Sequence, residues 1–171
     1  MRRGPLQMPY AFWLAVSPDG GFAAVSGGDN GDGADKSGAR GKVEVIDLST
    51  GRPLGPAREW AGNPRSQLVY SADGSRLLAS SPNGLVAVWD ADSVVPTATL
   101  AVPEGSALTA AFLANGRSAR ILDWDTGTAY DWDLSMQDAI EFACRAVGRG
   151  FTRDEWRQHF GDLAFQETCA Q

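Results

Sequence analysis

Residues 67–90 read QLVYSADGSRLLASSPNGLVAVWD, a stretch in which three short apolar runs alternate with two turn signals. Such runs are typical of β-strands, and they span residues 67–70, 76–80 and 85–89. The dipeptides Asp73-Gly74 and Asn83-Gly84 suit tight hairpins, because these residue types tolerate the positive φ angles that such turns require. The stretch therefore predicts three consecutive antiparallel strands, with a fourth over residues 96–100.

This pattern recurs along the chain with a single period. The closing Asp residues of the three units are Asp47, Asp90 and Asp133, each 43 residues from the next. A turn of the Asp-Gly or Asn-Gly type precedes each of them, at residues 17–20, 71–74 and 113–116. The first unit is longer because it contains the Gly- and Asp-rich segment 27–41, whose composition is that of an extended loop. A fixed period of this length predicts three similar β units in a row.

Four short strands in about 43 residues resemble one blade of a WD-repeat β-propeller. The closing dipeptides Trp89-Asp90 and Trp132-Asp133, with Ile46-Asp47 as a variant, carry this resemblance. It covers roughly residues 10–134 and implies a mainly β fold of about three four-stranded antiparallel blades, approximately 10–60, 66–100 and 106–134. No Gly-His dipeptide precedes any unit, so the buried Asp–His network of well-formed blades is not available to Asp47, Asp90 or Asp133, which are expected to cap turns.

Three blades are fewer than the four to eight of a closed propeller. We therefore expect residues 1–134 to form a partial propeller, the C-terminal portion of a larger one. Each blade buries its faces against its neighbours, so the missing blades would come from upstream sequence, another chain or self-association. Residues 4–8 resemble the outer strand of a preceding blade, and the third unit lacks a fourth strand of its own.

The last part of the sequence, 135–171, predicts a helical tail, because its apolar period changes from 2 to 3.6. An apolar stripe from Met136 to Val147 predicts a first helix. Thr152 and Glu155 form a capping box that opens a second helix, which ends at Gly161. Phe151 and Trp156 flank this box at the spacing of a hydrophobic staple.

This tail resembles that of actinobacterial WD-repeat proteins, in which the propeller often follows a STAND-type signalling NTPase. The matching residues are Ala143-Cys144, Val147-Gly148-Arg149, Phe151-Thr152, Glu155-Trp156 and Thr168-Cys169. The resemblance implies a bacterial signalling context. We expect the tail to cover the last blade, using Trp156, Phe160 and Ile140.

Two alternatives remain open for Cys144 and Cys169. The resembling tail pairs its cysteines, and a disulfide between these two, 25 residues apart, would stabilise the fold by roughly 3–4 kcal/mol. A reducing cytosol would instead keep two packed thiols.

Composition and charge exclude several classes of function. The 21 acidic residues outnumber the 15 basic ones, and the net charge of −6 argues against a nucleic-acid or anionic-membrane binder. The longest apolar run, Tyr10–Val16, is far shorter than the ~18 residues that span a bilayer. The N-terminus shows no signal-peptide pattern, so we expect a cytoplasmic chain.

The sequence offers few candidates for catalysis or metal binding. A single His (His159) and two Cys argue against a His-based triad and against His-rich or four-Cys zinc sites. The loop carboxylates Asp29, Asp32 and Asp35 lack the spacing of a calcium loop. The hairpin 123–133 places carboxylates beside aromatic residues; they are Asp123, Asp125, Asp131 and Asp133, with Trp124, Tyr130 and Trp132.

We therefore expect no enzyme, no catalytic residue, no cofactor and no metal ligand, but a protein–protein interaction or scaffold module. The loops would contact a protein partner, with segment 27–41 as the most variable contact. The predicted structural residues are Asp47, Trp89, Asp90, Trp132, Asp133 and Trp156. The alternatives are a hydrolytic, metal or ligand site in hairpin 123–133, and a truncated gene fragment without independent function.

Overall fold

The computed structural model describes residues 9–29, 40–102, 108–114, 116–135, 144–145, 148–161, 163–165, 167 and 169. Contacts within the chain divide it into two compact units, residues 1–132 and 133–171.

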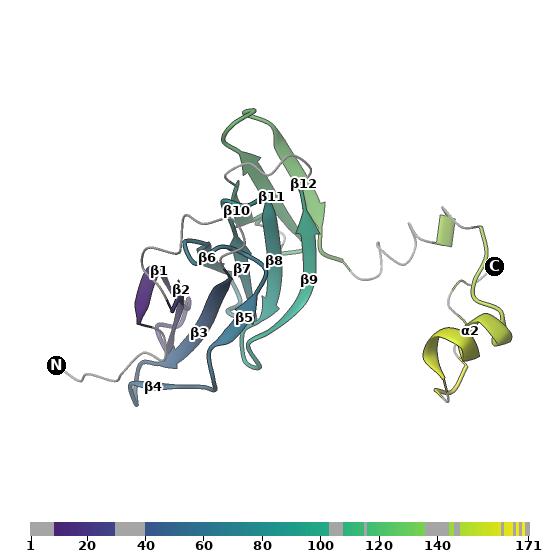
Figure 1. Ribbon diagram of the computed structural model, residues 1–171, viewed down its shortest axis with the longest axis horizontal. Coiled ribbons are helices and arrows are strands. Elements are labelled where there is room, and N and C mark those ends of the chain that lie inside the picture. Colours follow the sequence, from purple (N-terminus) through teal and green to yellow (C-terminus); the bar gives the residue numbers. More distant parts are fainter. Residues whose placement is uncertain are drawn as a thin grey trace. The chain divides into compact units, whose positions relative to one another are not determined.

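Three antiparallel sheets make up the first unit (Figure 1). The first has the order β1-β2-β3-β4, and β5 also pairs with β3; its strands are β1 (Tyr10–Val16), β2 (Phe22–Gly28), β3 (Gly41–Asp47), β4 (Arg52–Pro53) and β5 (Arg58–Trp60). The second comprises β6 (Gln67–Tyr70), β7 (Arg76–Ser80), β8 (Leu85–Asp90) and β9 (Val95–Ala101), in that order. The third comprises β10 (Leu108–Phe112), β11 (Ser118–Asp123) and β12 (Ala129–Asp133).

The prediction of a mainly β fold with antiparallel strands is confirmed. Strands β6 and β7 have the predicted bounds, and β9 contains the predicted fourth strand 96–100. The first sheet has five strands rather than four, because the predicted strand 53–60 is split into β4 and β5, with Pro56 between them. A proline cannot donate to a strand ladder, so the pairing with β3 lapses around it and resumes at β5.

Each sheet opens with the same hairpin turn. The backbone N–H groups of Gly20, Gly74 and Gly116 each donate over 2.9 Å to the carbonyl three residues earlier. All three glycines have positive φ angles, between 63° and 76°, which glycine adopts without steric cost. In the first two turns the hydroxyl of Ser17 or Ser71 also donates over 2.6 Å to the Asp two residues later. The repeat seen in the sequence is thus a repeat of hydrogen bonds.

The main hydrophobic core lies between the first and second sheets. It combines Val43, Val45 and Trp60 of the first sheet with Leu77 and other buried residues of the second; these others are Leu68, Tyr70, Ala79, Ala87, Trp89, Ala91 and Val94. The rings of Trp60 and Trp89 meet edge to face, with centroids 6.0 Å apart. Trp13 Nε1 donates to the Leu68 carbonyl over 3.1 Å, so β1 and β6 are joined by polar as well as apolar contact.

The second sheet also packs against the third. Strand β10 lies beside β6, β7 and β8. Across this contact, Arg76 donates to the Gly116 carbonyl, and its guanidinium lies 5.4 Å from the centre of the Phe112 ring. The second sheet is therefore flanked by neighbours on both sides, as Figure 1 shows for β6 to β8. The described strands form no closed ring.

Strand β1 carries a β-bulge. Ala11 pairs with Gly27 and Trp13 with Ser26, so Phe12 is an extra residue with no partner in β2. The Arg65 guanidinium lies 5.2 Å from the centre of the Phe12 ring. Beyond the bulge, Trp13 and Ala15 face the second sheet, and by alternation Leu14 and Val16 face the other way.

The second unit contains helix α2 (Arg153–Phe160). The predicted capping box is present at Thr152 and Glu155, and the helix ends at Gly161 as predicted. The rings of Phe151 and Trp156 meet with centroids 6.3 Å apart, as a hydrophobic staple requires. Of the predicted first helix, only Cys144 and Arg145 lie among the described residues, and both are helical. No helix in the described part of the chain combines the length and the apolar character needed to cross a membrane.

Candidate functional site

The three repeat-closing Asp residues hold turns. Asp47 Oδ1 accepts hydrogen bonds from the backbone N–H and the hydroxyl of Ser49, at 2.7 and 2.6 Å. Asp90 Oδ1 accepts the same pair from Ser93, at 2.8 and 2.6 Å. Asp133 Oδ1 accepts from Ser135 N over 2.8 Å. These bonds lower the pKa of Asp47 and Asp90, with the serine hydroxyl as the largest cause.

The predicted structural tryptophans have different environments. Trp89 is fully buried in the core, whereas Trp132 is half-buried. Trp156 is buried within the second unit, where its ring meets that of Phe165 at 5.8 Å and its Nε1 donates to the Leu163 carbonyl. The predicted packing of the tail on the last blade stays a prediction, and Ile140 and the Phe160 side chain lie outside the described residues.

The carboxylates of hairpin 123–133 do not converge on a common point. Asp123 Oδ1 accepts from the backbone N–H groups of Asp125 and Thr126, which closes the turn. Asp131 forms a bidentate ion pair with Arg120, at 2.7 and 2.8 Å. Among the residues that the structure describes, no group of three or more His, Cys, Asp or Glu side chains could hold a metal ion.

The acidic segment between β2 and β3 is described only at its start. Asp29 forms an ion pair with Lys42 of β3, at 2.7 Å. Asp32 and Asp35, with the rest of 30–39, lie outside the described residues. The lone His159 is exposed on α2, and its ring meets that of Phe151 at 6.0 Å.

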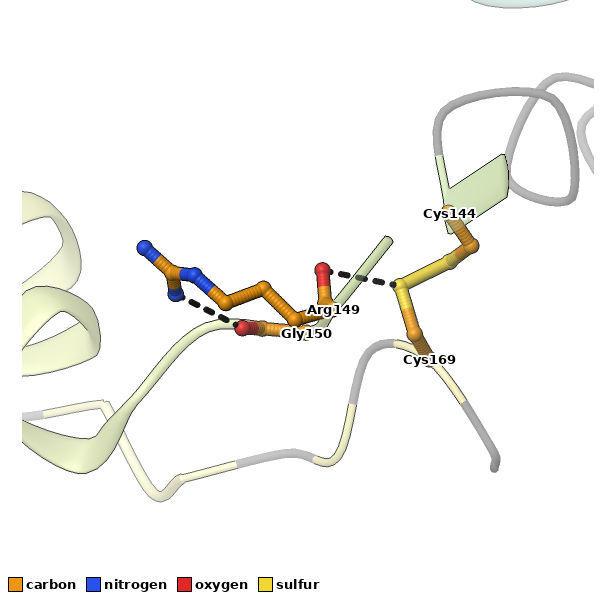
Figure 2. Close-up of a disulfide and its surroundings, with 4 residues drawn as sticks. All are labelled: Cys144, Arg149, Gly150 and Cys169. Atoms are coloured by element: carbon orange, nitrogen blue, oxygen red, sulfur yellow. Dashed lines mark hydrogen bonds between the residues drawn. A yellow bond between two sulfur atoms is a disulfide. The ribbon is translucent and has the colours of Figure 1, made fainter. Parts of the chain in front are cut away.

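Cys144 and Cys169 form a disulfide, so the structure contains the first of the two alternatives that the sequence left open (Figure 2). Cys169 Sγ lies 3.6 Å from the Arg149 carbonyl oxygen, a van der Waals contact because the bridged sulfur has no proton to donate. Arg149 in turn forms a bidentate ion pair with Glu155, at 2.6 and 2.7 Å. The pKa of Glu155 is lowered to about 2, chiefly by the hydrogen bonds from Arg149 and next by the hydrogen bond from the Thr152 backbone N–H.

A groove that the sequence did not predict lies between the first two sheets. It has a volume of about 520 Å³ and is formed where the turns 17–20 and 71–74 meet. Phe22 and Leu54 line it with apolar side chains, and Ala91 and Asp92 line it from the turn between β8 and β9. The two hairpins that repeat in sequence thus form one concave surface.

The groove is acidic. Asp19, Asp73 and Asp92 all line it, and the lining residues that the structure describes include no Lys or Arg. In both turns Oδ1 accepts every bond that the Asp receives, which leaves Oδ2 of Asp19 and Asp73 without a partner in the described part of the chain. Hydrogen bonds lower the pKa of Asp19, chiefly those from Ser17 and Gly21, and lower the pKa of Asp73 to about 2, chiefly those from Ser71 and Ser75.

Tyr70, the last residue of β6, also lines the groove. Its side chain is only 9% exposed, yet its hydroxyl has no hydrogen-bond partner among the described residues. Burial, and then the charges of Asp19 and Asp92, raise the pKa of Tyr70 to about 12. Buried hydroxyl groups in proteins are nearly always paired, which makes this one unusual. The core indole N–H groups of Trp60 and Trp89 also have no partner among the described residues.

The sequence contained both turns but no sign that they meet. The turns of Asp19 and Asp73 belong to different sheets, and the packing of the first sheet against the second, through β1, β2 and β6, brings them together. In the sequence, nothing distinguished Tyr70 from the other residues of the predicted strand 67–70. Comparison with known proteins adds no further guide, since no protein-family model and no curated protein matches this sequence.

Proposed function

We propose that this chain is a section of a WD-repeat-type β-propeller that works as a non-catalytic protein-interaction module. The observation that carries the proposal is the same hairpin, closed by the same backbone hydrogen bond, at the start of three neighbouring sheets. Their closing Asp residues are 43 residues apart, which is the length of one propeller blade. Lateral packing of the second sheet against both of the others agrees with blades in a row.

Exposed apolar residues at both ends of this row support a missing neighbour on each side. In β1, Leu14 is 61% and Val16 51% exposed, on the face turned away from the second sheet. At the third sheet, Tyr130 of β12 is 40% exposed and Trp124, in the turn between β11 and β12, is 65% exposed. Large apolar side chains gathered on one strand favour a surface that binds another protein surface. The neighbours would be further blades from upstream sequence, from another chain or from a second copy.

In such a module the sheets would act as a rigid support that presents turns to a partner. The turns are fixed by their own side chains, as Asp47, Asp90 and Asp123 illustrate. Binding to a preformed surface loses little conformational entropy. The segment 27–41, proposed as a variable contact, lies mostly outside the described residues.

Light scattering coupled to gel filtration tests the proposal. We expect the purified chain to self-associate or to need a partner for solubility, because its end sheets leave apolar surface exposed. The double variant Leu14→Lys/Val16→Lys should reduce association without unfolding, since both side chains are exposed. Leu163→Lys, at a leucine of the second unit that is 67% exposed, is the matched control. A well-behaved wild-type monomer would contradict the proposal.

A further inference from the structure

The groove between the first two sheets combines three features that bear on what it could bind. It is concave, it is lined by three carboxylates, and one of its lining residues, Tyr70, has a buried hydroxyl without a partner among the described residues. We propose that it binds the side chain of an arginine in an extended segment of a partner protein. This inference deepens the proposed function, on which it rests, by naming the chemistry of the partner.

The charge of the groove selects a cation. Asp19, Asp73 and Asp92 give it three negative charges at neutral pH, with no Lys or Arg among the described lining residues. Arg76 is close enough to act on Asp73, but its guanidinium donates to the Gly116 carbonyl in the third sheet. A cation that enters the groove would therefore contact carboxylates that can still accept hydrogen bonds.

The hydrogen-bonding groups of the groove select an organic cation rather than a metal. The described carboxylates form no group of three that could hold an ion. What they offer is a set of separated acceptors: Oδ2 of Asp19, the Asp92 carboxylate and the Tyr70 hydroxyl. A guanidinium carries five N–H donors in a fixed planar fork, so one group can reach several separated acceptors. A lysine ammonium is a single point and would satisfy fewer of them.

The apolar wall selects a side chain with an aliphatic stem. Phe22 and Leu54 both line the groove, and Leu54 is 44% exposed. Arginine buries its methylene groups along such surface while its charged end reaches polar partners. A volume of about 520 Å³ exceeds one arginine side chain and leaves room for adjoining backbone, which favours a peptide over free arginine.

Fluorescence polarisation with labelled peptides tests this inference on the full chain. The probes are a Gly/Ser/Ala heptapeptide with a central arginine, and the same peptide with lysine or with neutral citrulline in its place. We expect saturable binding of the arginine peptide, several-fold weaker binding of the lysine peptide, and at least about tenfold weaker binding of the citrulline peptide, because charge-assisted hydrogen bonds are lost. Free arginine amide should compete poorly.

Three variants locate the binding. Asp19→Asn/Asp92→Asn should weaken the arginine peptide at least about tenfold, while Asn at position 19 still offers Oδ1 to Ser17 and Gly21. Tyr70→Phe should weaken it several-fold yet leave the free energy of urea unfolding unchanged or higher, because the hydroxyl has no partner among the described residues. Asp154→Asn, at an exposed carboxylate of the second unit, is the control outside the groove and should bind as the wild type does.

Light scattering on the same samples separates the two proposals. Self-association without saturable arginine-peptide binding would overturn this inference alone. Saturable, variant-sensitive binding by a well-behaved monomer would support the groove and count against the proposed propeller section. Equal affinity for the arginine and citrulline peptides, or an equal loss in Asp154→Asn and the groove variants, would also overturn the inference.

Discussion

A serine and an aspartate two residues apart are the smallest repeated structure in this protein. The Ser17 hydroxyl donates to Asp19 and the Ser71 hydroxyl to Asp73, and each serine oxygen also accepts a backbone N–H five residues later. The serine and aspartate side chains thus supply hydrogen bonds at the tight turn, where the two strands cannot form them with each other. This role was visible in the sequence because Ser, Asp and Gly favour turns for separate local reasons.

The Asp73 turn predicts a specific dependence of stability on pH. Its pKa falls from 3.8 to about 2 on folding, so the charged form stabilises the fold above about pH 4. That contribution is lost as the pH falls from about 4 through about 2. In Asp73→Asn, which cannot titrate, we expect the urea midpoint to fall less steeply over this range. Identical profiles for wild type and variant would contradict the prediction, and Ser71→Ala should give an intermediate profile.

At the scale of single elements, local patterns predicted the strands and helix α2 but not what lies between them. Strands β6 and β7 and the capping box of α2 depend on residues close in sequence, and their predicted positions were confirmed. The groove joins turns of two sheets, so it depends on packing that no local pattern encodes. The Arg149–Glu155 ion pair was missed for a simpler reason: Glu155 was assigned to the capping box alone, although it serves both contacts.

The turn after β5 depends on a close approach between a glycine and an indole. A Cβ atom added at Gly62 would lie 2.1 Å from Cζ2 of Trp60, closer than atoms can pack. Gly62→Ala should displace the Trp60 ring from Trp89 and lower the free energy of unfolding by about 1–3 kcal/mol. Gly55→Ala, where an added Cβ meets nothing within 4 Å, is the matched control. Urea unfolding followed by tryptophan fluorescence measures both; equal stabilities would contradict the prediction.

Helix α2 is short and depends on its N-terminal cap. The Thr152 hydroxyl accepts the Glu155 backbone N–H, and the Glu155 carboxylate accepts the Thr152 backbone N–H. Thr152→Ala removes the first of these bonds and should destabilise the helix by about 1 kcal/mol. Amide hydrogen exchange should then quicken at residues 153–160. Thr152→Ser, which keeps the hydroxyl, should exchange as the wild type does, and unchanged exchange in Thr152→Ala would contradict the prediction.

At the scale of the whole molecule, the chain is two units of different construction. Residues 1–132 are held by sheets and an apolar core, whereas the described part of residues 133–171 shows helix α2, helical Cys144 and Arg145, a disulfide and a few aromatic contacts. A small unit that cannot bury much apolar surface commonly relies on a covalent link. The disulfide argues against the expected cytoplasmic location, because disulfide bonds seldom persist in reducing compartments.

Reduction of the disulfide should therefore destabilise the second unit. Linking residues 25 apart stabilises a fold by roughly 3–4 kcal/mol, which is large for a unit of this size. In Cys144→Ser/Cys169→Ser, or with a reductant present, we expect faster amide exchange and protease cleavage within residues 148–165. Amides of β6 to β8 should keep wild-type protection. Unchanged exchange and cleavage within residues 148–165 would contradict the prediction.

The bulge in β1 also determines where this chain can change length. Phe12 is the one residue of the strand that β2 does not pair, so deleting it would leave a regular ladder with Trp13 still opposite Ser26. A one-residue deletion inside β7 would shift its register, so that Leu77 and Leu78 would each point to the opposite face of the sheet. The side chains would then no longer fit the core on either face. Sequences diverging from this one can thus shorten at position 12, whereas the interior strands must conserve their residue count.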